Sequence, residues 1–202
     1  AGTLNPFGDS PAFDASSVSV TTRRDGEARL YGFDTRASGD VRAMQHGMLK
    51  AAVGVELRSE EFSDYFDPLT ESGAVMGIGG TSGEGDRDVA ATYGELLVPI
   101  MAELELQVAA RFDHYSDFGS TFNPKLSAAW RPTGSLLVRA NVGTGFKAPA
   151  LHELYSGDIV SFSSIFDPTT GNVEEVLTTA SGNLDLDAEE TDNYGVGLVW
   201  DA

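Results

Sequence analysis

The chain has 202 residues, no cysteine and a formal net charge of −18. The charge argues against a nucleic-acid partner, because phosphates would be repelled. The lack of cysteine excludes disulfides, zinc–thiolate sites and thiol catalysis. The longest apolar runs, such as residues 96–102, are about seven residues long, whereas a membrane helix needs about 18 or more. Membrane strands remain possible, since each needs only about 9–11 residues, half of them polar.

Hydrophobicity alternates residue by residue in seven segments, and a period of two predicts β-strands. The predicted strands are residues 27–39, 47–62, 88–98, 103–115, 121–131, 135–146 and 190–201. The clearest is the fourth, where apolar Leu104, Leu106 and Val108 alternate with Glu105 and Gln107. Connections of a few residues favour antiparallel neighbours. We therefore predict an all-β fold, an antiparallel up-and-down meander of about seven strands.

The connections between these strands alternate in length. Short ones follow the first, third and fifth strands, and long ones follow the second and the sixth, the latter of about 43 residues. Five residues, SDFGS, follow the fourth strand. We predict that all tight turns lie at one end of the sheet, as in outer-membrane barrels with short periplasmic turns and long extracellular loops. Residues 1–26 would then belong to an extracellular loop.

The two faces of the meander have different expected surroundings. We predict that five apolar side chains share an outward, lipid-facing surface: Leu106, Val108, Val138, Val142 and Leu198. Trp130 and Trp200 end their strands where an aromatic girdle would meet the periplasmic interface. A water-filled lumen would accept the charged residues of the opposite face.

Familiar catalytic motifs are incomplete in this chain. Gly143, Gly145 and Ala148 give G-x-G-x-x-A, but Pro149 leaves room for only a short turn of helix, so a dinucleotide site is not expected. The three histidines lack metal-binding spacing, and no serine lies in a G-x-S-x-G elbow. Adjacent strand residues such as Asp113 and its neighbouring histidine point to opposite faces. No cofactor is predicted.

The last third of the chain is acidic. No Lys or Arg follows Lys147, whereas eleven carboxylates do. A solvated acidic surface is one interpretation, and a field that attracts cations is the other. Asp185, Asp187 and Glu189 have an alternate-acid spacing suited to a hard cation, although the glycine of an EF-hand loop is missing. A loose calcium site and a mobile segment over residues 156–189 are the resulting predictions.

Three segments resemble the barrel of TonB-dependent outer-membrane receptors. They are RFDHYSDFGSTFNPKLSAAWRP at 111–132, VGTGFKAPALHELY at 142–155 and GNLDLDAEETDNYGVGLVW at 182–200. LNPFG near the start and VGVELRSEEFSDYFDP in the middle extend the likeness to nearly the whole chain. The chain departs from the usual pattern at Leu184 and Ala188, where prolines are common, and at Gly195, where a glutamate is common.

The resemblance implies that residues 1–202 are part of one β-barrel domain in the outer membrane of a Gram-negative bacterium. The chain begins at Ala1, and we expect it to be a middle section without the plug and the carboxy-terminal strands. Such receptors are not enzymes. They bind a scarce nutrient, such as an iron chelate, cobalamin, a peptide or a sugar, and the inner-membrane TonB complex moves the plug.

Within this section, the expected ligand contacts are the long loops at 63–87 and 147–189. Arg58, Asp113 and Arg139 are candidate ligand-binding residues near the bases of these loops. Two alternatives remain at this point. Short strands with turn signals also suit a soluble β-sandwich that binds a glycan or another protein. A passive pore is the third possibility.

Overall fold

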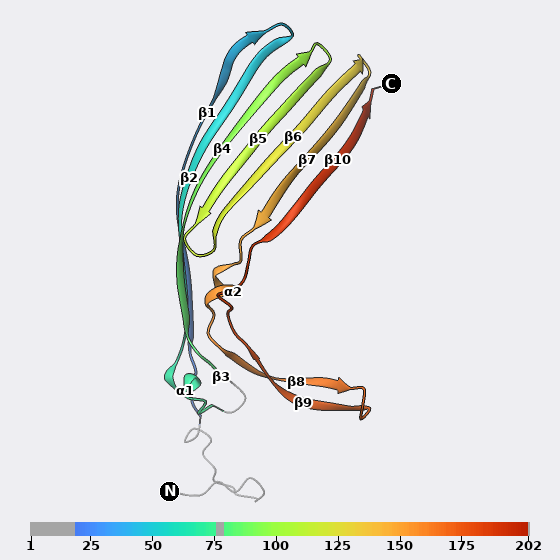
Figure 1. Ribbon diagram of the computed structural model, residues 1–202. Helices are drawn as coiled ribbons and strands as arrows, with labels where there is room; N and C mark the ends of the chain where they lie inside the picture. Colours follow the sequence, from blue (N-terminus) through green and yellow to red (C-terminus); the bar gives the residue numbers. More distant parts are fainter. Residues whose placement is uncertain (1–18, 76–78, 202) are drawn as a thin grey trace, which may run out of the picture.

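The structure is a computed structural model that describes residues 19–75 and 79–201 (Figure 1). Seven strands form one antiparallel sheet in the order β1-β2-β4-β5-β6-β7-β10. They are β1 Arg24–Met44, β2 Gly47–Phe66, β4 Gly83–Met101, β5 Leu104–Tyr115, β6 Gly119–Thr133, β7 Leu136–Lys147 and β10 Glu189–Trp200. The sheet is curved and open, with β1 and β10 at its edges (Figure 1). The predicted meander is therefore confirmed.

The two ends of the sheet differ, although not as completely as predicted. Two-residue turns at 45–46, 102–103 and 134–135 lie together at one end (Figure 1). At the other end lie the long connections 67–82 and 148–188, and also a tight turn at 116–118. The prediction that all tight turns share one end is wrong for this turn.

Local contacts explain why the 116–118 turn is tight. The Asp117 carboxylate accepts a hydrogen bond from the Phe118 amide, and the Tyr115 and Phe118 rings lie 4.5 Å apart. Gly119 has φ +102°, which a side chain would disfavour. These contacts fix the β5–β6 hairpin without a longer loop.

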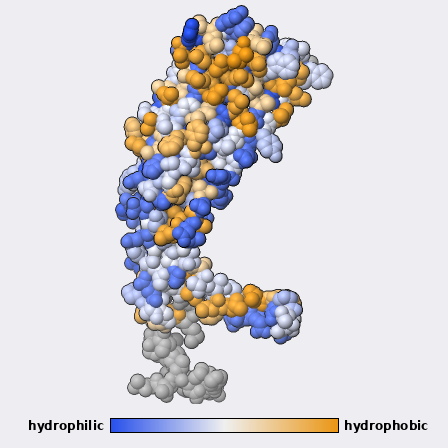
Figure 2. Space-filling model, in the orientation of Figure 1, coloured by the Kyte–Doolittle hydropathy of each residue, from blue (hydrophilic) through white to orange (hydrophobic). Residues whose placement is uncertain are grey.

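The strand register places the predicted apolar columns on one face. Residues that pair directly across an antiparallel sheet project from the same face. One such row is Leu96, Val108, Leu126, Val142 and Tyr194, and the Leu104 row adds Trp130, Val138 and Leu198. Most of these side chains are largely exposed, and hydrophobic residues gather toward the tight-turn end in Figure 2. The predicted common face is confirmed, and Trp130 and Trp200 both lie near its tight-turn edge.

The soluble β-sandwich is not supported. A sandwich buries the inner faces of two packed sheets. Among the described residues, the buried hydrophobic side chains, prolines aside, are only Val89, Ala91, Tyr115, Leu151 and Leu154. The apolar face of the large sheet has no second layer over it in this part of the chain. Among the same residues, no helix has the length and apolar character needed to cross a membrane.

The long connections contain regular structure. The 67–82 connection holds α1 Pro68–Glu71 and β3 Gly79–Gly80, and the 148–188 connection holds α2 Leu151–Tyr155, β8 Ile159–Asp167 and β9 Asn172–Ala180. The short helical turn expected after Pro149 is confirmed as α2. The expectation of a 43-residue loop without strands is wrong, because β8 and β9 pair as a hairpin and β3 pairs with β8.

Strand length sets the shape of the long-loop end. β1, β2 and β4 have 21, 20 and 19 residues, whereas β5, β7 and β10 have 12 each. The outward row Arg29, Glu61 and Asp86 lies on the extra length and is charged. The longer strands therefore extend past the apolar belt as a polar ribbon that bears the long connections (Figure 1). Of the predicted extracellular residues 1–26, those at 1–18 lie outside the described residues.

Candidate functional site

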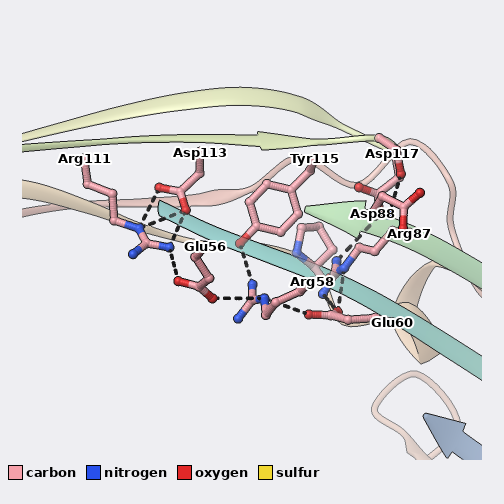
Figure 3. A network of polar contacts seen from close by, with 11 residues as sticks. Glu56, Arg58, Glu60, Arg87, Asp88, Arg111, Asp113, Tyr115 and Asp117 are labelled. Atoms are coloured by element: carbon pink, nitrogen blue, oxygen red, sulfur yellow. Dashed lines mark hydrogen bonds and ion pairs between the residues drawn. The ribbon is translucent and has the colours of Figure 1, made fainter. Parts of the chain in front are cut away.

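A network of charged side chains lies on the polar face where β5 ends and the longer strands continue (Figure 3). Glu56, Arg58 and Glu60 alternate along β2, so all three project from the same face. Arg87 on β4 pairs directly with Glu60. β5 contributes Arg111, Asp113 and Tyr115, and the turn after it contributes Asp117. Acidic and basic groups thus alternate across three strands.

At the β5 end of the network, Arg111 joins two carboxylates. Its Nε lies 2.9 Å from Asp113 Oδ1, and its Nη2 lies 2.9 Å from Glu56 Oε2. Asp113 is only 1 % exposed. Arg58 Nε lies 3.3 Å from Glu56 Oε1 and 3.6 Å from Glu60 Oε1. The chain of ion pairs therefore runs unbroken from β5 to the extended part of β2.

At the opposite end of the network, the buried Arg87 side chain contacts several partners at once. Its Nε donates to Glu60 Oε2 at 2.7 Å, and its Nη2 lies 2.6 Å from the same oxygen. Its Nη1 donates to the Pro149 carbonyl at 2.7 Å and lies 3.6 Å from Asp117 Oδ2. The guanidinium also stands 5.3 Å from the Tyr115 ring centroid. One side chain thus links the sheet to the start of the 148–188 connection.

The network nearly compensates its own charge. Four carboxylates, those of Glu56, Glu60, Asp113 and Asp117, face the three guanidiniums of Arg58, Arg87 and Arg111. Within the described residues, Arg58 Nε and Asp117 Oδ2 are buried without a hydrogen-bond partner. Removing one member of such a network costs more than the pair contributes, because a buried charge is left without compensation.

The base of the 148–188 connection packs against the same face. Leu151 and Leu154 of α2 are buried, and a Cβ added at Gly85 would lie 2.2 Å from the Tyr155 ring. The Ala150 amide donates to Glu153 Oε2 at 2.7 Å, and this bond lowers the pKa of Glu153. The helix is therefore held by close packing against β4 and by a hydrogen bond in its own first turn.

The 67–82 connection is fixed by Asp67. Its side chain caps α1 by accepting from the Leu69 and Thr70 amides, and it also accepts from the Thr70 hydroxyl and the Arg23 amide. These bonds, the Thr70 hydroxyl first, lower the pKa of Asp67 to about 2. The carboxylate ties the start of α1 to the chain just before β1.

The predicted ligand-binding residues do not all lie together. Arg58 and Asp113 belong to the network and are linked through Glu56 and Arg111. Arg139 shares their face but pairs with Gly197 on β10, toward the tight-turn end. The side chain of Arg139 has no ion-pair partner in the described part of the chain. Asp113 and His114 project from opposite faces of β5, as predicted. Asp113 pairs with Arg111 in the network, whereas the His114 ring bonds the Ser120 hydroxyl.

Sequence reasoning missed most of the network. The missed members are Glu56, Glu60, Arg87, Arg111 and Asp117. The alternating E-x-R-x-E of residues 56–60 was a usable signal, because period two puts the three charges on one face. Arg87 gave no such signal, because it follows a Gly-rich stretch.

The metal-binding role of Asp185, Asp187 and Glu189 remains a prediction. Glu189 pairs with Lys147 at 2.8 Å, and the Asp185 amide donates to the Asn183 side chain. Across residues 19–75 and 79–201, no group of three or more His, Asp or Glu side chains could hold a metal ion.

Comparisons with known proteins bear on this arrangement. The family model "TonB dependent receptor-like, beta-barrel" matches residues 2–202. The chain belongs to this family. It is 30 % identical over 125 residues to the vitamin B12 transporter BtuB of Photobacterium profundum, covering 62 % of this chain and 17 % of the relative. It is 26 % identical over 179 residues to the ferric enterobactin receptor PirA of Pseudomonas aeruginosa, and the match covers 81 % of this chain and 23 % of that receptor.

Solved structures agree on the fold. The siderophore receptor PirA from Acinetobacter baumannii superposes with a TM-score of 0.64 at 18 % identity, covering 87 % of this chain and 25 % of the receptor. A variant of the ferric enterobactin receptor PfeA from Pseudomonas aeruginosa, in complex with enterobactin, gives a TM-score of 0.66 at 18 % identity. The match covers 88 % of this chain and 25 % of the receptor. The chain thus spans about a quarter or less of the length of these relatives.

Proposed function

We propose that residues 1–202 are part of one barrel domain of an outer-membrane active transporter that binds a scarce nutrient through its extracellular loops. The observation that carries the proposal is the two-faced, unequal-ended sheet, with an exposed apolar outer face and a charged inner face beside the long connections. Bacterial outer-membrane barrels combine these features.

The height of the apolar face supports a membrane setting. On β5 the outward apolar side chains run from Leu104 to Phe112. Eight residues of strand rise about 26 Å, and a tilt of roughly 40° reduces this to about 20 Å along the membrane normal. An outer-membrane barrel has an apolar band about 25 Å tall. The long connections then lie on the extracellular side.

The proposed ligand contacts are the 67–82 and 148–188 connections, with Arg58 and Asp113 at their bases and Arg139 deeper in the lumen. The work of this barrel is binding and conformational change, without bond-breaking chemistry. Energy would come from the TonB complex acting on a plug domain. The names of the relatives give vitamin B12 and ferric enterobactin as the two nutrients to test first.

Growth of the source bacterium tests the proposal. We expect deletion of the parent gene to abolish growth on either limiting cobalamin or iron supplied as ferric enterobactin, and the intact gene to restore it. Purified full-length receptor should bind the same nutrient. Unimpaired growth on both, and on other limiting iron, peptide and sugar sources, would contradict the proposal. Uptake that persists without TonB would instead indicate a passive pore.

A further inference from the structure

The three cationic groups of the network differ in what they hold. Among the described residues, the polar partners of Arg58 and Arg111 are side chains of the sheet, whereas Arg87 also binds the backbone of a long connection. Arg87 is 7 % exposed, and its Nη1 donates to the Pro149 carbonyl two residues before α2 begins. Arg87 is therefore the member of the network in direct contact with the 148–188 connection.

The orientation of Arg87 is set from the sheet side. Glu60 accepts from Nε and lies close to Nη2, which leaves Nη1 free to point at Pro149. A guanidinium can make these bonds at once because its donors form a rigid fork, whereas a lysine ammonium is a single point. Asp117 Oδ2 lies 3.6 Å from Nη1 and adds an ion pair without a hydrogen bond.

Glycines of β4 leave room for α2 and the residues just after it to pack closely against the strand. A Cβ at Gly83 would lie 2.2 Å from the Tyr155 carbonyl oxygen, and one at Gly85 would overlap the Tyr155 ring. Any side chain at these positions would push α2 off the wall. Gly83, Gly85 and Arg87 alternate on β4, so the glycines and the hydrogen bond lie on one face.

Beyond α2, the 148–188 connection is joined to the other long connection. Gly79 and Gly80 of β3 pair with Val160 and Ile159 of β8. The Thr81 amide donates to the Asp158 carbonyl at 2.7 Å, and the Asp158 amide donates to the Thr81 hydroxyl at 2.7 Å. The 67–82 and 148–188 connections therefore form one unit that carries the β8–β9 hairpin (Figure 1).

We propose that Arg87 is a positioning residue that latches this unit to the inner wall of the barrel. The proposal rests on the proposed function only in placing the unit at the extracellular mouth. With the latch closed, α2 stays on the wall and the hairpin keeps a fixed direction. Without the Arg87 guanidinium, Glu60 and Asp117 lose their common cation and Pro149 loses its donor, so the base of the unit opens more often while the sheet remains intact.

Amide hydrogen exchange of the full-length receptor in detergent micelles, without nutrient, tests the latch. For Arg87→Gln we expect exchange at residues 152–158 to rise about tenfold, as the loss of one charge-assisted hydrogen bond implies, and exchange in β5 to stay unchanged. Arg87→Lys should give a smaller rise. The matched control is Arg29→Gln, because Arg29 also pairs with two carboxylates, Glu27 and Glu61, but lies on the exposed outer face of β1.

Wild-type exchange at residues 152–158 in both Arg87 variants would overturn the proposal. So would an equal rise in the Arg29→Gln control, since the effect would then not depend on the latch. If Arg87→Gln does not assemble, Arg87→Lys decides alone, because it keeps the charge beside Glu60 and loses only the fork. A receptor that binds none of the tested nutrients can still show the latch, so the two proposals can fail separately.

Discussion

Val108→Lys tests whether the apolar face meets lipid. Val108 lies on β5, four residues from both Leu104 and Phe112, which bound the outward apolar side chains of that strand. It is therefore near the midplane of the proposed belt and is 46 % exposed in this chain. A lysine at that depth should lower the free energy of unfolding by about 2–4 kcal/mol.

The control is the adjacent residue. Gln107 faces the polar side and donates to Glu95 Oε1 at 2.7 Å. Gln107→Lys would place an ammonium beside the same carboxylate, where a partly solvated ion pair changes the free energy of unfolding by about 0–1 kcal/mol. Guanidinium titrations of the full-length receptor in phospholipid vesicles would measure both variants. Equal losses at Val108 and Gln107 would refute a lipid-facing surface on one side only.

Three further predictions concern polar groups. Arg111→Met should leave buried Asp113 without its cation and lower the free energy of unfolding by about 2–3 kcal/mol. This is below the usual loss of about 3–5 kcal/mol because Arg111 is 35 % exposed. A loss no larger than that of Arg29→Met would contradict the prediction. The pKa of Asp67 is lowered to about 2, so its contribution to stability should be complete above about pH 4 and disappear as pH falls toward 2. Amide protection in α1, taken relative to the intrinsic exchange rate at each pH, should show this loss, and Asp67→Asn should reduce the pH dependence to the part that Glu71 contributes. Millimolar calcium should slow amide exchange within residues 156–189 of the full-length receptor, and unchanged protection would leave them as solvated surface.

The large sheet was readable from the sequence because its chemistry repeats every two residues. One apolar outer face and one polar inner face impose that period on β2, β5 and β7, and short turns impose antiparallel neighbours. At the tight turn, β1 was predicted to end at residue 39 and ends at Met44. At the long connections, β1 and β4 were predicted to begin three and five residues too late. There the strands leave the belt and both faces become polar, so the alternation ends while the hydrogen-bonded ladder continues.

The β8–β9 hairpin could not be read in the same way. On its apolar face, Ser164 interrupts the run of Phe162 and Phe166, and Glu175 pairs with that serine. The partner of β8 on its other side is Gly79–Gly80, a glycine pair with no strand signal about 80 residues earlier in the chain. The β3–β8 pairing is long-range, so no local pattern carries it.

The glycines before Arg87 show why the central member of the network was missed. Gly83 and Gly85 disfavour a strand prediction, because glycine adds no packing side chain and costs backbone entropy. They are tolerated in β4 because the Tyr155 segment fills the space above them. The two glycines therefore weaken the strand signal in the sequence, and they also let α2 pack close enough for Arg87 to bind the Pro149 carbonyl.

The charged residues beside the long connections form two groups whose electric fields extend over different distances. The inner-wall network holds four carboxylates against three guanidiniums at contact distances, so its field at a distance is small. Residues 148–188 hold seven carboxylates and no Lys or Arg, and the 148–188 connection is exposed over most of its length. Solvent-exposed charge acts over about 8 Å at physiological salt. We therefore expect the 148–188 connection to influence which charged solutes approach, and the network to fix the shape of the sheet that they reach.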